Sequence, residues 1–339
     1  KNNRGHMTQP LRLLVSDMTW SSIQTDVYQA LAGHAIDRIT VDEVLTGHKV
    51  ADIAFISRDV TGMSTKFVIE PETQRFYDAL SQSPDLRWLH VHSAGADRQI
   101  YLDLMARGVT VSTASGANAR AVAQTALAGL LALARKLPQL MKAQRDHEWL
   151  PLLKTGLPED LDGQTAVIVG WGPIAQMIGE VLHLLGVRIV VVRRSSAEVS
   201  IAEQVVTFDK ISDVLPSADW LVLACPLNAQ THHLVNDVAL SAIKPGAAIV
   251  NIARGTVIDE PAMIQALKDG RLSGAFLDVF AQEPLPSDSA LWDLPNVIAT
   301  PHTAGSSQGM YRRMEQTFTD NLARYLQSKP LHNVASSTD

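Results

Sequence analysis

The stretch Thr165–Gly186, TAVIVGWGPIAQMIGEVLHLLG, decides the fold of this 339-residue chain. Its apolar, β-branched opening predicts a strand, and the residues from Pro173 onward predict a helix. Between them, Gly170, Gly172 and Ala175 form the pattern G-x-G-x-x-A. The first glycine permits a tight turn, the second lets the backbone approach a pyrophosphate, and the alanine lets helix and strand pack closely. This order predicts a dinucleotide site at the helix N-terminus, in preference to a structural turn.

The next predicted strand, Arg188–Val192, ends in two arginines and two serines. An NAD-selective site carries Asp or Glu near this point to accept hydrogen bonds from the ribose. Arg193 cannot accept a hydrogen bond, but it can pair with a 2′-phosphate. We therefore predict NADP(H) as the cofactor, contacted by Arg193, Arg194 and Ser195. An ordinary solvated strand end is the alternative interpretation.

Short apolar runs alternate with amphipathic stretches on both sides of this loop. In the first half they predict strands of βαβ units within residues 11–16, 50–57, 86–92 and 106–114. In the second half they predict six strands, within residues 164–170, 188–192, 219–225, 246–252, 274–280 and 296–300. Residues 115–137 predict a helix between the halves, and residues 307–330 predict a terminal helix that returns to the first half.

The alternation predicts the α/β fold class, with two doubly wound parallel-sheet domains. We expect a dinucleotide-binding Rossmann domain at 115–302, inserted in a flavodoxin-like substrate domain at 7–114 and 303–335. Residues 1–6 read as a tag remnant and Met7 as the native start.

Composition narrows the class of ligand. The formal net charge of −6, without a lysine or arginine run, argues against nucleic acid or an anionic membrane and favours a small molecule. The lack of a long apolar run or export signal predicts a cytoplasmic protein. The one cysteine, Cys225, lies in an apolar run and predicts an inert core thiol. We predict no metal site, because neither His90 with His92 nor His232 with His233 has an Asp, Glu or Cys cluster beside it.

Four further motifs carry a family resemblance: HSAGAD (92–97), ANARAVAQTALAGLLALAR (117–135), NIARGTVIDEPAMIQALKDGRLSGAFLDVFAQEPLP (251–286) and LPNVIATPHTAG (294–305). In this order they closely resemble the D-isomer-specific 2-hydroxyacid dehydrogenases. Within that family the chain looks most like NADPH-dependent glyoxylate/hydroxypyruvate reductases. The first 85 residues are much less distinctive.

The resemblance implies three catalytic residues, Arg254, Glu283 and His302. Reduction of a 2-keto acid needs a cation for the carboxylate, a hydride donor and an acid that protonates the new alkoxide. Arg254 offers a fork that fits a carboxylate, and His302 can donate the proton. Glu283, if in contact, stabilises the imidazolium form of His302.

The resemblance also implies the contacts to substrate and cofactor. Substrate contacts are Arg254 and the backbone amides of Ala94 and Gly95, while Arg58 is a candidate with a surface role as its alternative. Asp278 is placed beside the cofactor, with a capping or turn role as its alternative. The full set of predicted cofactor contacts is Gly170, Trp171, Gly172, Pro173, Ile174, Arg193, Arg194, Ser195, Cys225, Pro226, Thr231, Ile252, Ala253, Asp278 and His302.

The predicted function is reduction of a small 2-keto acid, such as glyoxylate or hydroxypyruvate, by NADPH to a D-2-hydroxy acid. A homodimer is implied by resemblance alone. Trp149, on the family's dimer arm, is expected to pack within its own subunit, and the alternative is that it enters the pocket of a neighbouring subunit. One alternative is a dinucleotide-sensing, corepressor-like binding protein on the same scaffold. A second is a formate dehydrogenase, but Glu283 argues against it because that branch carries glutamine at the acid position.

Overall fold

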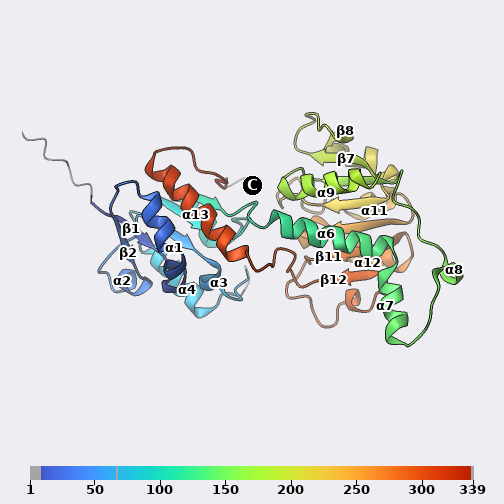
Figure 1. The fold of residues 1–339 in the computed structure, drawn as a ribbon, viewed down its shortest axis with the longest axis horizontal. Coiled ribbons are helices and arrows are strands. Elements are labelled where there is room, and N and C mark those ends of the chain that lie inside the picture. Colours follow the sequence, from blue (N-terminus) through green and yellow to red (C-terminus); the bar gives the residue numbers. More distant parts are fainter. Residues whose placement is uncertain (1–8, 66–67, 337–339) are drawn as a thin grey trace, which may run out of the picture. The chain divides into compact units, whose positions relative to one another are not determined.

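The computed structural model describes residues 9–65 and 68–336, so the predicted tag remnant and native start lie outside the described residues. The chain forms two compact units (Figure 1). Unit 1 runs to Asn118 and resumes at Ser307, and unit 2 is Ala119–Ser306. One unit therefore lies inside the other in sequence, which confirms the predicted insertion. The sequence predicts the two boundaries between the domains at 114/115 and 302/303, whereas the two units of the structure meet at 118/119 and 306/307.

Unit 1 is built on a parallel sheet with the strand order β2-β1-β3-β4-β5, the flavodoxin-like order. Its elements are β1 (Leu11–Leu14), α1 (Asp17–Ala30), β2 (Ile36–Ile39), α2 (Val41–Leu45), β3 (Ile53–Ile56), α3 (Arg58–Thr61), α4 (Pro71–Ser81), β4 (Trp88–Val91), α5 (Gln99–Ala106), β5 (Thr110–Thr113) and α13 (Met310–Leu326). The prediction omitted β2, an edge strand whose middle residues, Asp37 and Arg38, hide its pattern.

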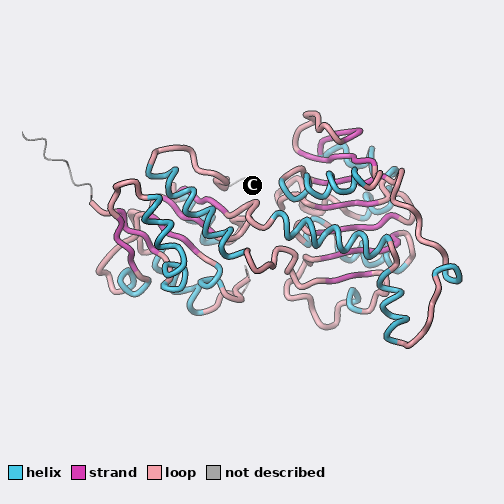
Figure 2. Tube along the Cα trace, viewed as in Figure 1, coloured by secondary structure: helices cyan, strands magenta, loops and turns pink. Residues whose placement is uncertain are grey.

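Both faces of this sheet are covered, because alternate residues of its strands enter two different cores (Figure 2). Ile53 and Phe55 of β3 belong to one core, and Ala54 and Ile56 belong to the other. The first core also contains Phe318 of α13, whose ring stacks on Phe55 with the ring centroids 4.6 Å apart. The terminal helix thus returns to the first half, as predicted, and it packs beside α1.

The two segments that connect unit 1 to unit 2 are held by one arginine. Arg313 on α13 donates to the carbonyl of Ala117 (2.7 Å) and to the side-chain oxygen of Asn118 (3.2 Å). It also donates to the hydroxyl of Ser307 (2.6 Å), where the chain returns. A single guanidinium therefore fixes both segments at one place on unit 1.

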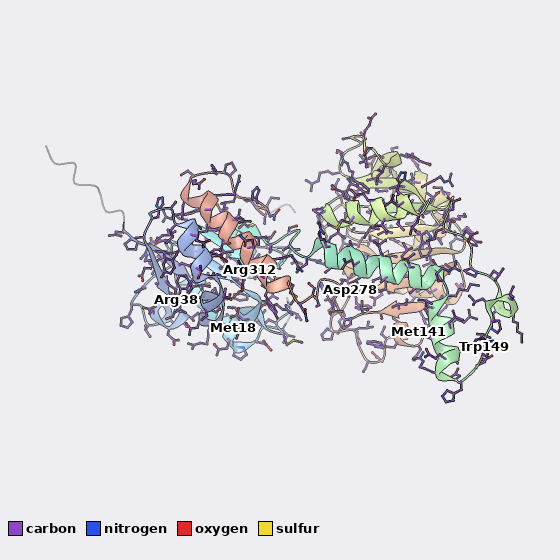
Figure 3. All side chains as sticks on the ribbon, viewed as in Figure 1. Met18, Arg38, Met141, Trp149, Asp278 and Arg312 are labelled. Atoms are coloured by element: carbon purple, nitrogen blue, oxygen red, sulfur yellow. The ribbon has the colours of Figure 1, made fainter. Side chains whose placement is uncertain are left out.

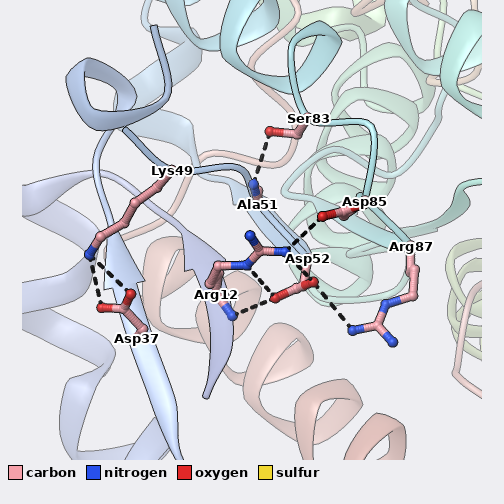
Figure 4. A network of polar contacts seen from close by, with 8 residues as sticks. All are labelled: Arg12, Asp37, Lys49, Ala51, Asp52, Ser83, Asp85 and Arg87. Carbon is pink, nitrogen blue, oxygen red and sulfur yellow. Dashed lines mark hydrogen bonds and ion pairs between the residues drawn. The ribbon is translucent and has the colours of Figure 1, made fainter. Parts of the chain in front are cut away.

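The amino ends of the unit 1 strands carry a charge network (Figure 4). Arg12 donates to both carboxylate oxygens of Asp52, at 2.9 and 3.0 Å, and also to Asp85. Burial raises the pKa of Asp52, but the hydrogen bonds and charge of Arg12, with the charge of Arg87, outweigh burial and leave the pKa below its usual value. These groups connect β1 to the start of β3 and to the loop before β4. They lie at the amino ends of the strands, whereas the predicted substrate residues follow the carboxyl ends.

Unit 2 has a seven-stranded parallel sheet with the order β12-β11-β10-β9-β6-β7-β8, the Rossmann order with one added edge strand. Its strands are β6 (Thr165–Val169), β7 (Arg188–Arg193), β8 (Ala202–Thr207), β9 (Trp220–Leu223), β10 (Ala247–Asn251), β11 (Leu272–Leu277) and β12 (Val297–Ala299). Its helices are α6 (Ala119–Ala134), α7 (Leu137–Arg145), α8 (Leu152–Thr155), α9 (Pro173–Leu184), α10 (Ile211–Val214), α11 (Asp237–Ala242) and α12 (Glu260–Lys268). The predicted count of six strands is wrong, because β8 is a partly exposed edge strand with weak alternation.

The helix predicted at 115–137 is shorter than expected. It is α6, and it ends before Lys136, which has a left-handed backbone (φ 56°) and precedes the proline-containing start of α7. A Cβ on Gly129 of α6 would lie 2.2 Å from the Phe276 ring of β11, so this glycine permits the close crossing of helix and sheet. The expectation for Trp149, on the segment after α7, is wrong: it is 93% exposed and does not pack within its own subunit.

Candidate active site

The glycine loop of unit 2 lies where the strand order reverses, between β6 and β9. Gly170 has φ +94°, and its N–H donates to the carbonyl of Val192 (2.7 Å). A Cβ at this position would lie 2.6 Å from the carbonyl oxygen of Ala224, directly after β9. Both the turn and the close approach therefore require glycine, which is the role the sequence predicts for Gly170.

The second glycine faces open space. Gly172 precedes α9, and a Cβ built on it would meet no described atom within 4 Å. The packing of the protein therefore does not require glycine at this position. A phosphate bound at the N-terminus of α9 would fill the open space. Ala175 is fully buried in the core between helix and sheet. The loop therefore fits a dinucleotide pyrophosphate.

The residues between and after the glycines differ in what they can present to a ligand. The Trp171 ring covers Gly179 of α9, where a Cβ would lie 2.6 Å from it. Ile174 packs against the same core, and Pro173 is the first residue of the helix. Their side chains therefore shape the loop and its helix.

The arginine after β7 is preorganised by its own turn. Arg193 donates through Nε to the carbonyl of Ser195 (3.0 Å) and through Nη2 to its hydroxyl (3.1 Å). Arg194 and Ser195 are exposed, while Arg193 is half-buried. A guanidinium has five N–H donors, so these two bonds leave donors for an anion. The turn therefore gathers positive charge and a hydroxyl at the end of β7.

The predicted contacts after β9 serve their own loop. Cys225 is buried, and burial raises the pKa of its thiol to about 12, which confirms the prediction of an inert core thiol. The Thr231 hydroxyl donates to the carbonyl of Pro226 (2.7 Å) and accepts from the N–H of Asn228 (2.8 Å). Thr231 is fully buried, whereas Pro226 is exposed.

Arg254 follows β10 in a loop that Asn251 shapes. The Asn251 side chain donates to the carbonyl of Arg254 (3.1 Å) and accepts from the N–H of Ala253 (3.0 Å). Arg254 itself donates to the carbonyl of Ala253 (2.8 Å). A Cβ on Gly255 would lie 1.8 Å from the carbonyl carbon of Phe280, so only glycine lets this loop touch the one that carries Glu283. Ile252 and Ala253 are buried beneath it.

Glu283 and His302 form an acid–histidine pair. Oε2 of Glu283 lies 2.7 Å from Nδ1 of His302, and Oε1 accepts from the N–H of Phe280 (3.1 Å). Burial raises the pKa of Glu283, but the hydrogen bond and charge of His302, the Phe280 amide and the charge of Arg254 outweigh burial and lower the pKa below its usual value. The carboxylate thus holds the Nδ1 proton, and Nε2 has no hydrogen-bond partner among the described residues.

Asp278 holds the loop that carries His302. Its carboxylate is buried and accepts from the hydroxyl of Thr300 (2.7 Å) and the amides of Thr303 (2.9 Å) and Ala304 (3.0 Å). Its carbonyl accepts from the N–H of His302, whose backbone is left-handed (φ 48°). These contacts match the capping role that was the alternative for Asp278. Its four hydrogen bonds fix the loop in which His302 has an unfavourable backbone conformation.

In unit 1 the predicted substrate residues lie after β3 and β4. Ser93, Ala94 and Gly95 follow β4, and the amides of Ala94 and Gly95 donate to no described residue. Arg58 begins α3 after β3, is half-buried, and forms no ion pair or side-chain hydrogen bond within the described parts of the chain. The adjacent strands bring Arg58 close to His92.

His92 is buried and neutral. Its Nε2 lies 2.9 Å from the hydroxyl of Thr61, which donates to the carbonyl of Arg58, so Nε2 carries the ring proton. Nδ1 has no partner among the described residues. Burial, reinforced by the positive charges of Arg58 and Arg98, lowers the pKa of His92 to about 3. No group of three metal-binding side chains occurs among residues 9–65 and 68–336, and no helix in those ranges is long and apolar enough to cross a membrane.

The sequence of residues 127–304 matches the family model described as D-isomer specific 2-hydroxyacid dehydrogenase, NAD binding domain. This chain belongs to the D-isomer specific 2-hydroxyacid dehydrogenase family. The predicted resemblance is thereby confirmed. As a member of the family, the protein is an NAD(P)-binding oxidoreductase that reduces keto acids.

Relatives in this dehydrogenase family are about one-third identical to this chain over the aligned residues. The glyoxylate/hydroxypyruvate reductase B of Pectobacterium carotovorum subsp. carotovorum is 34% identical over 268 residues, which are 76% of this chain and 82% of that protein. The protein of the same name from Yersinia pseudotuberculosis serotype O:3 is 31% identical over 321 residues, 92% and 94% of the two chains. A family structure from Aeromonas salmonicida subsp. salmonicida A449 gives a TM-score of 0.76 at 28% identity, covering 97% of this chain and 100% of that one.

Several residues that shape the dehydrogenase site were not predicted. Asn251, Gly255 and Thr300 contact the loops that carry the predicted catalytic residues, but they are not themselves of a typical catalytic type. Asn251 had a readable signal, since asparagine after a strand often bonds its own turn. The roles of Gly255 and Thr300 depend on which loops meet, and a sequence alone does not report that.

Proposed function

We propose that this dehydrogenase reduces a small 2-keto acid of the glyoxylate or hydroxypyruvate type with NADPH, giving the D-hydroxy acid when the product is chiral. The observation that carries the proposal is the pair of Glu283 and His302 at 2.7 Å, with the charge of Arg254 acting on the same carboxylate. Reduction of a keto acid needs a proton donor and a cation. A histidine bonded to a carboxylate can donate the proton, and an arginine whose charge acts on the same carboxylate can supply the cation. The names of the relatives support the substrate class.

Each residue has a separate task in this mechanism. Arg254 binds the carboxylate and polarises the ketone, and the free amides of Ala94 and Gly95 bind the carboxylate as well. Arg58 remains a candidate for the same ligand. The bound nicotinamide supplies the hydride. His302, as the imidazolium that Glu283 stabilises, donates its Nε2 proton to the new alkoxide and becomes neutral, with the proton on Nδ1 still held by Glu283.

The proposed preference for NADPH over NADH rests on the turn after β7. Arg193 takes the place of the acid that would accept from a ribose hydroxyl, and its guanidinium can pair with a 2′-phosphate. Arg194 and the hydroxyl of Ser195 lie in the same turn and add charge and a donor. The other cofactor contacts predicted from the sequence are retained as part of this proposal, apart from Asp278, whose carboxylate bonds its own loop.

Initial rates test the proposal directly. We expect turnover of glyoxylate and hydroxypyruvate with NADPH, and a preference for NADPH over NADH that falls about 10- to 100-fold in Arg193→Asp, the scale of one charge-assisted hydrogen bond. Arg188→Asp, at the exposed opposite end of β7, is the matched control and should keep the wild-type preference. Equal use of NADH by the wild type would refute the cofactor assignment. No turnover with either cofactor would refute the reaction.

We also propose that the protein is a homodimer. Met141, Trp149, Leu153 and Leu157 form an exposed apolar segment beginning on α7 (Figure 3 labels Met141 and Trp149). Exposed apolar side chains gathered in this way are typical of an interface. Sedimentation should show a dimer that Trp149→Ser weakens, whereas Val238→Ser, an exposed position on α11, should have no effect. A monomer in the wild type would contradict the proposal.

A further inference from the structure

Unit 1 contains a cavity of about 570 Å³ at the amino ends of its strands, where none of the residues of the proposed mechanism lies. Arg87 immediately precedes β4 and Thr110 is the first residue of β5. The other walls come from Tyr325 in the last turn of α13 and from four residues of the segment 328–334. All of these residues belong to unit 1.

The chain that follows α13 is fixed against the sheet. Ser328 has a left-handed backbone (φ 51°) and reverses the chain at the end of the helix. Further on, the carbonyl of Asn333 accepts from the N–H of Thr113 in β5 (3.0 Å). The ring of Tyr325 stacks on the buried Trp88, with the ring centroids 5.2 Å apart. The walls of the cavity are therefore held by hydrogen bonds and by packing.

The described wall carries two cations, Arg87 and Lys329, and no carboxylate. Lys329 forms no ion pair or side-chain hydrogen bond with any residue that the structure describes. Arg87 reaches Asp52 with one nitrogen, at 3.5 Å (Figure 4). The stronger partner of Asp52 is Arg12, which donates to both carboxylate oxygens. The cavity thus keeps a local positive charge, in a chain whose formal net charge is −6.

Three hydroxyls of the wall can donate to the same ligand. Within residues 9–65 and 68–336, the hydroxyls of Thr110, Tyr325 and Ser328 form no hydrogen bond. Burial raises the pKa of Tyr325, although the charge of Arg87 lowers it, so the phenol keeps its proton at neutral pH. The wall therefore combines two charged donors with three neutral ones.

The C-terminus of α13 lies beside the cavity, and the partial negative charge of a helix C-terminus disfavours an anion. In this helix the last carbonyls are already bonded. The amides of Gln327, Ser328 and Lys329 donate to the carbonyls of residues 323–325. The side chains therefore determine the sign of the charge that the cavity presents.

These donors match a phosphate better than a carboxylate. A phosphate monoester has three terminal oxygens and carries nearly two negative charges at neutral pH, whereas a carboxylate has two oxygens and one charge. Arginine and lysine both bind phosphate through charge-assisted hydrogen bonds. The volume lies within the roughly 300–1,000 Å³ of small-molecule sites, which is more than a phosphate group alone fills. Leu331 and Val334 give the rest of the wall an apolar surface.

We propose that this cavity binds a small phosphate monoester. The phosphate contacts Arg87 and Lys329, and the organic part lies against Leu331 and Val334. The site differs from the proposed carboxylate loop, because Arg87 precedes β4 whereas Ala94 follows it. Its test is therefore independent of the proposed function.

Isothermal titration calorimetry of the full-length protein tests the site with ribose 5-phosphate, inorganic phosphate and malonate at one ionic strength. Ribose 5-phosphate should bind more tightly than inorganic phosphate by about fourfold or more, the scale of one buried methylene group. Malonate, a dicarboxylate of the same charge, should bind more weakly than both. Lys329→Gln and Arg87→Gln should each raise the Kd of ribose 5-phosphate about tenfold, the scale of one charge-assisted hydrogen bond.

Two control variants show where the phosphate binds. Lys268→Gln removes the same charge from an exposed residue at the end of α12 and should keep the wild-type Kd. Arg193→Asp alters the turn after β7 and should keep it as well. A loss of binding in Arg193→Asp, with Lys329→Gln unaffected, would assign the phosphate to that turn and overturn the proposal.

Three further results would contradict the phosphate site. The first is a wild type that binds neither phosphate compound. The second is a Kd that both Arg87→Gln and Lys329→Gln leave unchanged. The third concerns the class of ligand: malonate binding as tightly as ribose 5-phosphate would exclude phosphate recognition, and inorganic phosphate binding as tightly would exclude the ester.

Discussion

The two sheets reverse their strand order in the same way, yet the loops at the two reversals have opposite character. At β6 and β9 of unit 2, Gly170 packs closely against the backbone after β9, and Gly172 leaves open space before α9. At β1 and β3 of unit 1, methionine and aromatic side chains surround a cavity. The shared topology gathers loops outside the carboxyl ends of the strands in both units, and the residues of those loops decide what each can present to a ligand.

The histidines of the two units show the same contrast. His302 of unit 2 is half-exposed and bonded to a carboxylate, so it can carry a proton. His92 of unit 1 is buried and neutral, and a hydroxyl is its one hydrogen-bond partner among the residues that the structure describes. A histidine that follows a strand can therefore be a proton donor or a neutral, buried side chain. Its burial and its hydrogen-bond partner decide which of the two it is.

Removing the proton donor of unit 2 should have the largest effect. His302→Asn keeps a residue that tolerates a left-handed backbone but cannot protonate an alkoxide, so kcat should fall about 10²- to 10⁴-fold. Steady-state kinetics with a 2-keto acid measures this. His147→Asn, another exposed histidine with positive φ (57°), is the matched control and should retain full activity. Unchanged turnover in His302→Asn would rule out the mechanism.

Loosening the loop that carries His302 should have the next largest effect. Asp278→Asn replaces an acceptor of three bonds by a group with one acceptor oxygen, so we expect kcat to fall by roughly 10- to 100-fold while cofactor affinity is retained. Stopped-flow turnover and cofactor titration separate the two quantities. A loss confined to cofactor affinity would instead favour the cofactor contact predicted from the sequence.

Closing the glycine turn of unit 2 should weaken cofactor binding about tenfold or more. Gly170→Ala adds a Cβ at 2.6 Å from a carbonyl oxygen, in addition to the left-handed backbone cost of roughly 1–2 kcal/mol. Gly246→Ala has a similar φ of +86° but no described atom within 4 Å, so it isolates the backbone cost. Fluorescence titration with the cofactor measures both. Equal effects of the two variants would show that the close approach is unimportant.

The buried histidines of unit 1 should give the smallest effect, a pH dependence of stability. His90 and His92 have pKa values of about 3 when folded, against about 6.5 when unfolded, so the unfolded state binds more protons between these values. Stability is therefore complete above pH 6.5 and falls as the pH drops toward 3, by at most about 1.4 kcal/mol per pH unit for each histidine.

Urea unfolding at pH 7.5 and pH 5.0 checks this dependence. His92→Gln should reduce the difference between the two pH values, and the exposed His34→Gln should not. If both variants keep the wild-type difference, His92 is not the group that binds the proton on unfolding.

The sequence predicted the fold class because apolar periodicity reports buried strands well. It missed β2 and β8, since edge strands bury little and their polar residues break the pattern. It named Arg254 and Glu283 through motifs, but not that Gly255 lets their loops meet. Its expectation for Trp149 failed because nothing in an isolated aromatic residue tells whether its own chain will cover it.

The contacts of Arg313 bear on how such a chain can be built from two parts. Because one guanidinium nitrogen bonds the side-chain oxygens of both Asn118 and Ser307, the residues at the two ends of the cut that would remove unit 2 are neighbours. An insertion whose ends are so close interrupts its host at a single surface point. Unit 1 can therefore be treated as a complete flavodoxin-like domain into which a cofactor module has been spliced, and a short linker in place of residues 119–306 would restore its uninterrupted chain.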